Sequence, residues 1–242
     1  MRPHLLAAVL ALSVVSSAAH AQPQTRRVYS APWAPSESTV READRAVARR
    51  EILPAARRLW SRAPGCSETF RVIGAADGAF TGRGLAQRAV LYRFCEAGRD
   101  QARGGVAIVE AGRMVAHVTI EHATPDALQT GPDVDENGVG ELVLVDSLRE
   151  NGVITADVAL VQLEPGGVRS FGAITVYDEN FGTDQPMHRE MASILTATPG
   201  PTPVFELETY IFREGMRARW VGLDRPHRVT LAQGRATYRR VR

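Results

Sequence analysis

Lysine is absent from this sequence, and all 29 residues counted as Lys or Arg are arginine. The absence excludes a Walker-type phosphate lysine, a Schiff-base lysine and a lysine general base. Aromatic residues make up only 6% of the chain. The 242 residues still include 44% hydrophobic and 23% charged residues, which excludes a disordered, collagen-like or coiled-coil chain and leaves enough apolar material for a substantial core.

Long apolar runs are also missing, except for a short one at the N-terminus. Arg2 precedes an apolar run over residues 5–15, and an Ala-His-Ala tripeptide ends at Ala21, the pattern of a secretory cleavage site. The run is shorter than the roughly 20 residues of a membrane span. We therefore expect residues 1–21 to be a signal peptide cleaved after Ala21, and the mature chain to be periplasmic or secreted, with no transmembrane segment.

The mature chain is nearly neutral. Without residues 1–21 it carries 28 arginines against 27 acidic residues. This overall balance gives no electrostatic indication of a nucleic-acid partner.

Cysteine is scarce, and Cys66 and Cys95 are the only two. In an exported chain a single disulfide between them is the simplest assignment. It would close a loop of about 30 residues, worth roughly 3–4 kcal/mol in the chain-entropy description. The alternative is a pair of buried free thiols.

The pattern of apolar residues divides the mature chain into three parts. Residues 22–35 are Pro-rich and aperiodic, typical of a linker or extended leader. Residues 36–62 predict an N-terminal helical segment that Pro54 ends or kinks. Residues 63–242 alternate short apolar segments with Gly turns, and no helix-length pattern separates them. The predicted fold class is therefore mainly β, with antiparallel hairpin or blade-like units forming a propeller-like or sandwich structure whose closure stays open. The expected strands cover residues 89–94, 106–110, 114–120, 141–146, 153–163, 168–177, 204–212, 218–223, 228–232 and 236–241.

A weak internal repeat runs through this β region. A shift of 54 residues places residues 78–84 on 132–138 and Gln87 on Glu141. Each copy then continues as strand, Gly turn, strand, Gly turn, strand. The match indicates either a duplication or a chance alignment of hairpins.

Residues 133–141 form the segment most informative about chemistry. They contain the acidic residues Asp133, Asp135, Glu136 and Glu141. Asn137 adds another oxygen and Gly138 permits a sharp turn, a combination suited to a hard cation. With no Cys or His in the segment, Ca²⁺ is favoured over Zn²⁺. The alternative is an Asp/Asn/Gly turn with no metal.

The segment resembles the calcium loops of FG-GAP repeats, as in integrin-type β-propellers and the VCBS-like repeats of exported bacterial proteins. Those loops read D-x-D-x-D-G-x-x-D/E and lead directly into a strand. The resemblance implies one structural Ca²⁺ held by Asp133, Asp135, Asn137, the backbone carbonyl of Val139, and Glu141. Asn137 replaces the third acid, which implies a dissociation constant on the order of 10⁻⁴–10⁻³ M. In the upstream copy Arg83 stands in the place of Asn137, which implies that this copy holds no metal, and two or three repeats cannot close a propeller of four or more blades.

Motifs of the common enzyme classes are missing from the sequence: it contains no HExxH, CxxC, GxSxG or P-loop. The leading hypothesis is an exported, non-enzymatic binding or interaction module with an unknown protein or glycan partner. The alternative is a hydrolase whose site is assembled from dispersed residues. The candidates for such a site are His117, Glu121, Asp178, His188 and Glu190.

Overall fold

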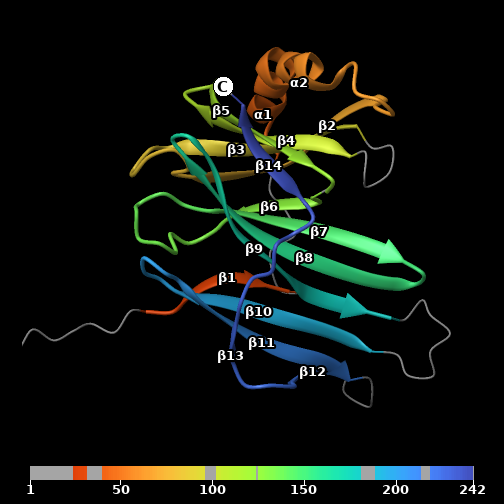
Figure 1. Ribbon diagram of the computed structural model, residues 1–242, viewed down its shortest axis with the longest axis vertical. Coiled ribbons are helices and arrows are strands. Elements are labelled where there is room, and N and C mark those ends of the chain that lie inside the picture. Colours follow the sequence, from red (N-terminus) through yellow and green to blue (C-terminus); the bar gives the residue numbers. More distant parts are fainter. Residues whose placement is uncertain are drawn as a thin grey trace, which may run out of the picture.

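The computed structural model describes residues 24–31, 40–95, 102–123, 125–180, 189–213 and 219–241. Two antiparallel sheets and one helical segment make up this part of the chain (Figure 1). The mainly β, antiparallel class expected from the sequence is therefore confirmed. The expected signal peptide lies outside the described residues. No helix among the described residues is long and apolar enough to cross a membrane.

The first sheet has five strands in the order β14-β5-β4-β3-β2. Its strands are β2 (Glu68–Gly78), β3 (Gln87–Cys95), β4 (Arg103–Glu110), β5 (Arg113–Glu121) and β14 (Thr237–Val241). The turn between β4 and β5 is Ala111-Gly112, between the strands expected over residues 106–110 and 114–120. Both residues have positive φ, 49° and 77°, as a two-residue hairpin turn of the primed type requires.

The second sheet has nine strands. Its main path runs β12-β11-β10-β9-β8-β7-β6, while β1 pairs with β10 and β13 pairs with β11. Its strands are β1 (Arg26–Ser30), β6 (Ala127–Thr130), β7 (Leu142–Glu150), β8 (Val153–Glu164), β9 (Gly167–Glu179), β10 (Glu190–Thr198), β11 (Val204–Arg213), β12 (Arg219–Gly222) and β13 (His227–Val229). Within the segment expected to be a linker or extended leader over residues 22–35, residues 26–30 form strand β1, which pairs with β10 and buries Val28.

The helical segment comprises α1 (Glu42–Val47), a π-helical turn (Ala48–Ile52) and α2 (Leu53–Trp60). Pro54 lies in the first turn of α2. Proline lacks an N–H and crowds the preceding helical turn, and the π turn lies where that crowding falls. The helix therefore continues past the proline instead of ending there.

The helical segment packs on the five-stranded sheet. Ile52 and Trp60 are buried against Tyr92 and Phe94 of β3. A disulfide joins Cys66 to Cys95 at the end of β3, which confirms the pairing expected from the sequence.

The repeat at 54 residues is visible in the structure. Strand β5 begins at Arg113 and β9 at Gly167, 54 residues later. Phe80 and Val134, which the shift aligns, are both fully buried. The order loop, strand, hairpin, strand, hairpin, strand is the same in β3-β4-β5 and β7-β8-β9. The two copies thus share their topology as well as their sequence pattern.

Candidate metal centre

The acidic loop connects β6 to β7. The Gly131 N–H donates to the carbonyl of Glu141 at 2.7 Å and closes the neck of the loop. The carboxylate of Asp133 then accepts from the backbone N–H groups of Asn137 at 3.0 Å and Gly138 at 2.8 Å. Gly138 has φ 86°, which is accessible to glycine at low cost. Local hydrogen bonds therefore set the turn as the sequence predicts.

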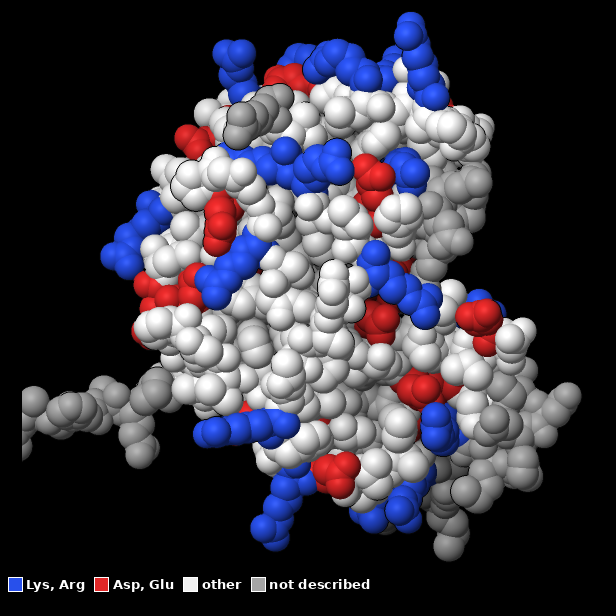
Figure 2. Space-filling view, in the orientation of Figure 1, with Lys and Arg blue, Asp and Glu red and all other residues white. Residues whose placement is uncertain are grey.

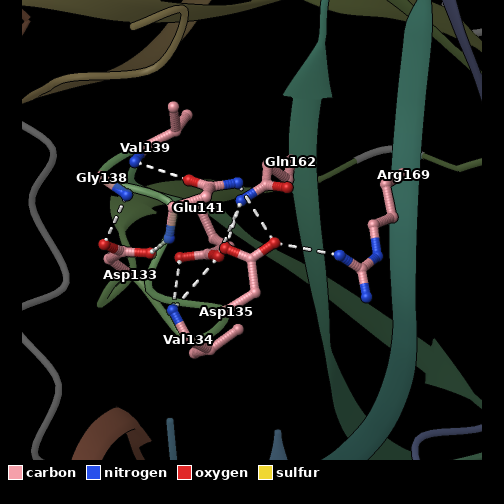
Figure 3. Close-up of polar contacts among 9 residues, drawn as sticks. Asp133, Val134, Asp135, Gly138, Val139, Glu141, Gln162 and Arg169 are labelled. Atoms are coloured by element: carbon pink, nitrogen blue, oxygen red, sulfur yellow. Dashed lines mark hydrogen bonds and ion pairs between the residues drawn. The ribbon is translucent and has the colours of Figure 1, made fainter. Parts of the chain in front are cut away.

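Three carboxylates converge inside this loop (Figure 3). Oxygens of Asp133, Asp135 and Glu141 all lie within 4.8 Å of one another. Glu141 is fully buried, and its two oxygens each lie 3.2 Å from the Val134 N–H. Burial, together with the nearby Asp135 and Asp133 carboxylates, raises the pKa of Glu141 to about 8 against the opposing effect of the Val134 N–H.

Two residues from neighbouring strands complete the cluster. Gln162 of β8 donates from Nε2 to Asp135 Oδ1 at 3.2 Å and to Glu141 Oε1 at 3.1 Å. Arg169 of β9 forms an ion pair with Asp135 at 2.9 Å and lies 4.4 Å above the ring of Phe171. Neither was expected from the sequence. The available signal was the isolated polar Gln162 in an otherwise apolar stretch of β8.

Asn137 and Val139 lie at the exposed rim. Asn137 donates from Nδ2 to Asp135 Oδ2 at 3.1 Å, and its Oδ1 accepts from the Val139 N–H at 2.7 Å. For Asn137 to act as a ligand, its amide must rotate and turn the oxygen from Val139 toward the carboxylates. The structure thus brings together three of the five expected ligands directly and places the other two beside them.

The donor set fits a hard divalent cation. Asp133, Asp135 and Glu141 offer only oxygen, which suits Ca²⁺. Arg169 is the guanidinium that pairs with one of these carboxylates among the described residues. Arg26 donates instead to the backbone carbonyl of Asp133 at 2.8 Å. Three converging carboxylates with one ion pair leave negative charge that a cation can balance.

The corresponding loop of the first copy, residues 79–86, is described throughout and contains no such cluster. Gln87 occupies the position of Glu141, and its Oε1 accepts from the N–H groups of Phe80 at 2.9 Å and Thr81 at 3.0 Å. A neutral amide thus holds the first loop on its strand where a carboxylate holds the second.

The dispersed candidates for a hydrolase site divide between the two sheets. His117 of β5 is buried and lies 2.5 Å from the Tyr92 hydroxyl through Nε2. Glu121, also on β5, pairs with Arg103 at 3.5 Å. The remaining described candidates belong to the nine-stranded sheet, and His188 lies outside the described residues. Asp178 pairs with Arg189 at 3.0 Å, and Glu190 accepts from Tyr177 at 2.9 Å.

The chain matches no protein-family model, no curated protein and no solved structure.

Proposed function

We propose that this chain is an exported, non-enzymatic β protein that uses one structural Ca²⁺ loop and acts as a binding or interaction module. The proposed ligands are the side chains of Asp133, Asp135, Asn137 and Glu141 and the carbonyl of Val139. Export is supported by the apolar run over residues 5–15, by the Ala-His-Ala tripeptide that ends at Ala21 and by the disulfide.

The convergence of three carboxylates is the observation that carries the calcium proposal. Their oxygens lie within 4.8 Å of one another, a spacing that one cation can bridge. The fully buried Glu141 directly precedes β7, while Asp133 and Asp135 belong to the loop. An ion among them ties the loop to its strand, so its role is structural.

The non-enzymatic part of the proposal is supported by the distribution of the candidate catalytic residues. His117 is held in the core beside Tyr92 on the five-stranded sheet. Asp178 and Glu190 pair with other residues on the nine-stranded sheet. Catalytic groups must share one cleft to act on one substrate.

Thermal unfolding in calcium and in chelator tests the metal claim. At calcium tenfold above the dissociation constant, binding to the folded state adds only ~1.4 kcal/mol. For a domain of this size we therefore expect the midpoint to rise by roughly 2–6 °C in 10 mM CaCl₂ relative to EDTA. Asp135→Ala should abolish the rise.

Glu150→Ala is the matched control, because Glu150 is an exposed carboxylate at the far end of β7. It should keep the full calcium response. A midpoint that calcium leaves unchanged in the wild type overturns the metal claim, as does an equal response in wild type and Asp135→Ala.

A further inference from the structure

The near-neutral net charge of the chain conceals a strong separation of charge along it. Residues 219–241, which the structure describes throughout, contain six arginines and one acidic residue, whereas residues 22–218 contain 21 arginines and 26 acidic residues. We call residues 219–241 the basic segment. Its excess of five positive charges within 23 residues is typical of a surface that contacts a polyanion.

The arginines of the basic segment differ in their contacts from many of the arginines earlier in the chain. Several of the earlier arginines form ion pairs with carboxylates, among them Arg57 with Glu68 and Arg88 with Asp44. In the described part of the basic segment no arginine does so. Even Arg228, which lies opposite Glu206 in the β13–β11 register, forms no ion pair with it. Apart from Arg240, which donates to the backbone carbonyl of Glu164, these guanidinium groups therefore keep their capacity to bind an external anion.

The segment crosses the molecule from one sheet to the other. It begins at β12 and β13 beside β11, passes β9 where Ala173 and Ala232 form a bridge, and ends as β14 beside β5 (Figure 1). The face that it crosses carries arginine side chains from its lower edge to its top, with carboxylates between them (Figure 2). The exposed arginines along the basic segment are Arg219, Arg225, Arg228, Arg235 and Arg239.

We propose that the basic segment binds an extended acidic polysaccharide. Guanidinium groups pair strongly with carboxylate and sulfate groups. Because the arginines follow one another across two sheets instead of surrounding one pocket, they suit a polymer better than a small anion. The proposal specifies the glycan partner of the proposed binding module and rests on that binding role, but it does not depend on the calcium loop.

Two other polyanions fit the segment less well. A membrane surface is bound with the help of apolar side chains that enter the lipid, and Leu223 is the large exposed hydrophobic residue of the described basic segment. Single-stranded nucleic acid is bound by exposed aromatic rings, whereas Trp220 packs against Phe212 and Tyr238 packs into the core. An acidic polysaccharide needs neither feature.

Binding to immobilised heparin and polygalacturonate tests the proposal. We expect the full chain to bind both in 50 mM NaCl with EDTA present, and neutral dextran to retain none. The triple variant Arg228→Ser/Arg235→Ser/Arg239→Ser should bind heparin at least tenfold more weakly. The slope of its log affinity against log salt concentration should be smaller in magnitude than that of wild type by about two to three.

The matched control is Arg45→Ser/Arg149→Ser, which removes exposed arginines outside the basic segment and should bind heparin within twofold of wild type. Circular dichroism should show all variants folded. The proposal is overturned by absence of polysaccharide binding, by an equal loss in the control, or by tighter binding to duplex DNA or phosphatidylglycerol vesicles. Because EDTA is present throughout, failure here is distinct from failure of the calcium melts.

Discussion

Gln87 donates from Nε2 to Glu110 Oε2 at 2.7 Å across β3 and β4. In the second copy Gln162 donates from Nε2 to Glu141 Oε1 at 3.1 Å across β7 and β8. Each pair lies one residue beyond the last paired residues of its hairpin, so the amide and the carboxylate have exchanged strands between the copies. The first copy thereby places a neutral group beneath its loop, and the second places an acid there.

The first prediction concerns Gln87. Gln87→Ala removes the acceptor for the Phe80 and Thr81 N–H groups and the donor to Glu110. Since Gln87 is buried, the freed groups lose hydrogen bonds without regaining full hydration, and we expect a loss of about 2–4 kcal/mol. Urea unfolding measures the loss. The exposed Gln233→Ala is the control, and an equally small effect in both variants would contradict the prediction.

The second prediction concerns the contact between the two loops. A Cβ built on Gly138 overlaps the side chain of Arg83, whereas one on Gly84 meets nothing within 4 Å. Both glycines have positive φ, 86° and 72°, so alanine costs about 1–2 kcal/mol of backbone strain at either position.

Gly138→Ala should therefore destabilise the chain by more than Gly84→Ala, as measured by urea unfolding. Adding Arg83→Ala to Gly138→Ala should remove this extra loss of stability, because the overlap with the Arg83 side chain is then gone. Equal losses for the two single variants would show that Arg83 gives way without cost.

The sequence predicts features whose causes are local. The acidic loop is shaped by hydrogen bonds that Asp133 makes to residues four and five positions later, and such contacts are readable from spacing. The strands around residues 89–94 and 153–163 are rich in apolar residues, and they form as expected.

The sequence does not predict features that depend on pairing between strands far apart in the chain. Strand β10 contains small and polar residues such as Ser193 and Thr196, and its pairing with β11 and β1 decides its conformation. Arg169 reaches Asp135 because β9 pairs with β8, and this register is not contained in either local sequence. The pairing of β8 with β9 thus determines the contact that Arg169 makes with the acidic loop.

The third prediction concerns pH. Burial lowers the pKa of His117 to about 4, and the nearby Arg58 adds to the effect. Between about pH 6.5 and 4 the unfolded chain therefore binds a proton that the folded chain does not. Stability should fall through this window as pH decreases, and the contribution of His117 reaches about 3 kcal/mol.

Urea unfolding at pH 7 and pH 4 measures the fall. The variant His117→Gln does not titrate at this position, so its fall between the two values should be smaller than that of the wild type. The exposed His227→Gln is the control and should behave as wild type. If His117→Gln and wild type lose the same stability, the acid sensitivity has another source.

The last prediction concerns Glu141, the buried carboxylate of the second loop. Glu141→Gln places at this position the residue type that Gln87 already supplies in the upstream copy. The amide oxygen can still accept from the Val134 N–H, but the buried negative charge facing Asp133 and Asp135 is removed. In EDTA at pH 8 we therefore expect the variant to be at least as stable as wild type, with a gain of up to about 1 kcal/mol in urea unfolding.

Because an amide is a weaker ligand for a hard cation than a carboxylate, calcium should no longer shift the thermal midpoint of Glu141→Gln. Calorimetric titration of both proteins with CaCl₂ provides the independent measurement, with Glu150→Gln as the control that keeps wild-type binding. Undiminished calcium binding by Glu141→Gln would show that the carboxylate at the foot of β7 is not a ligand.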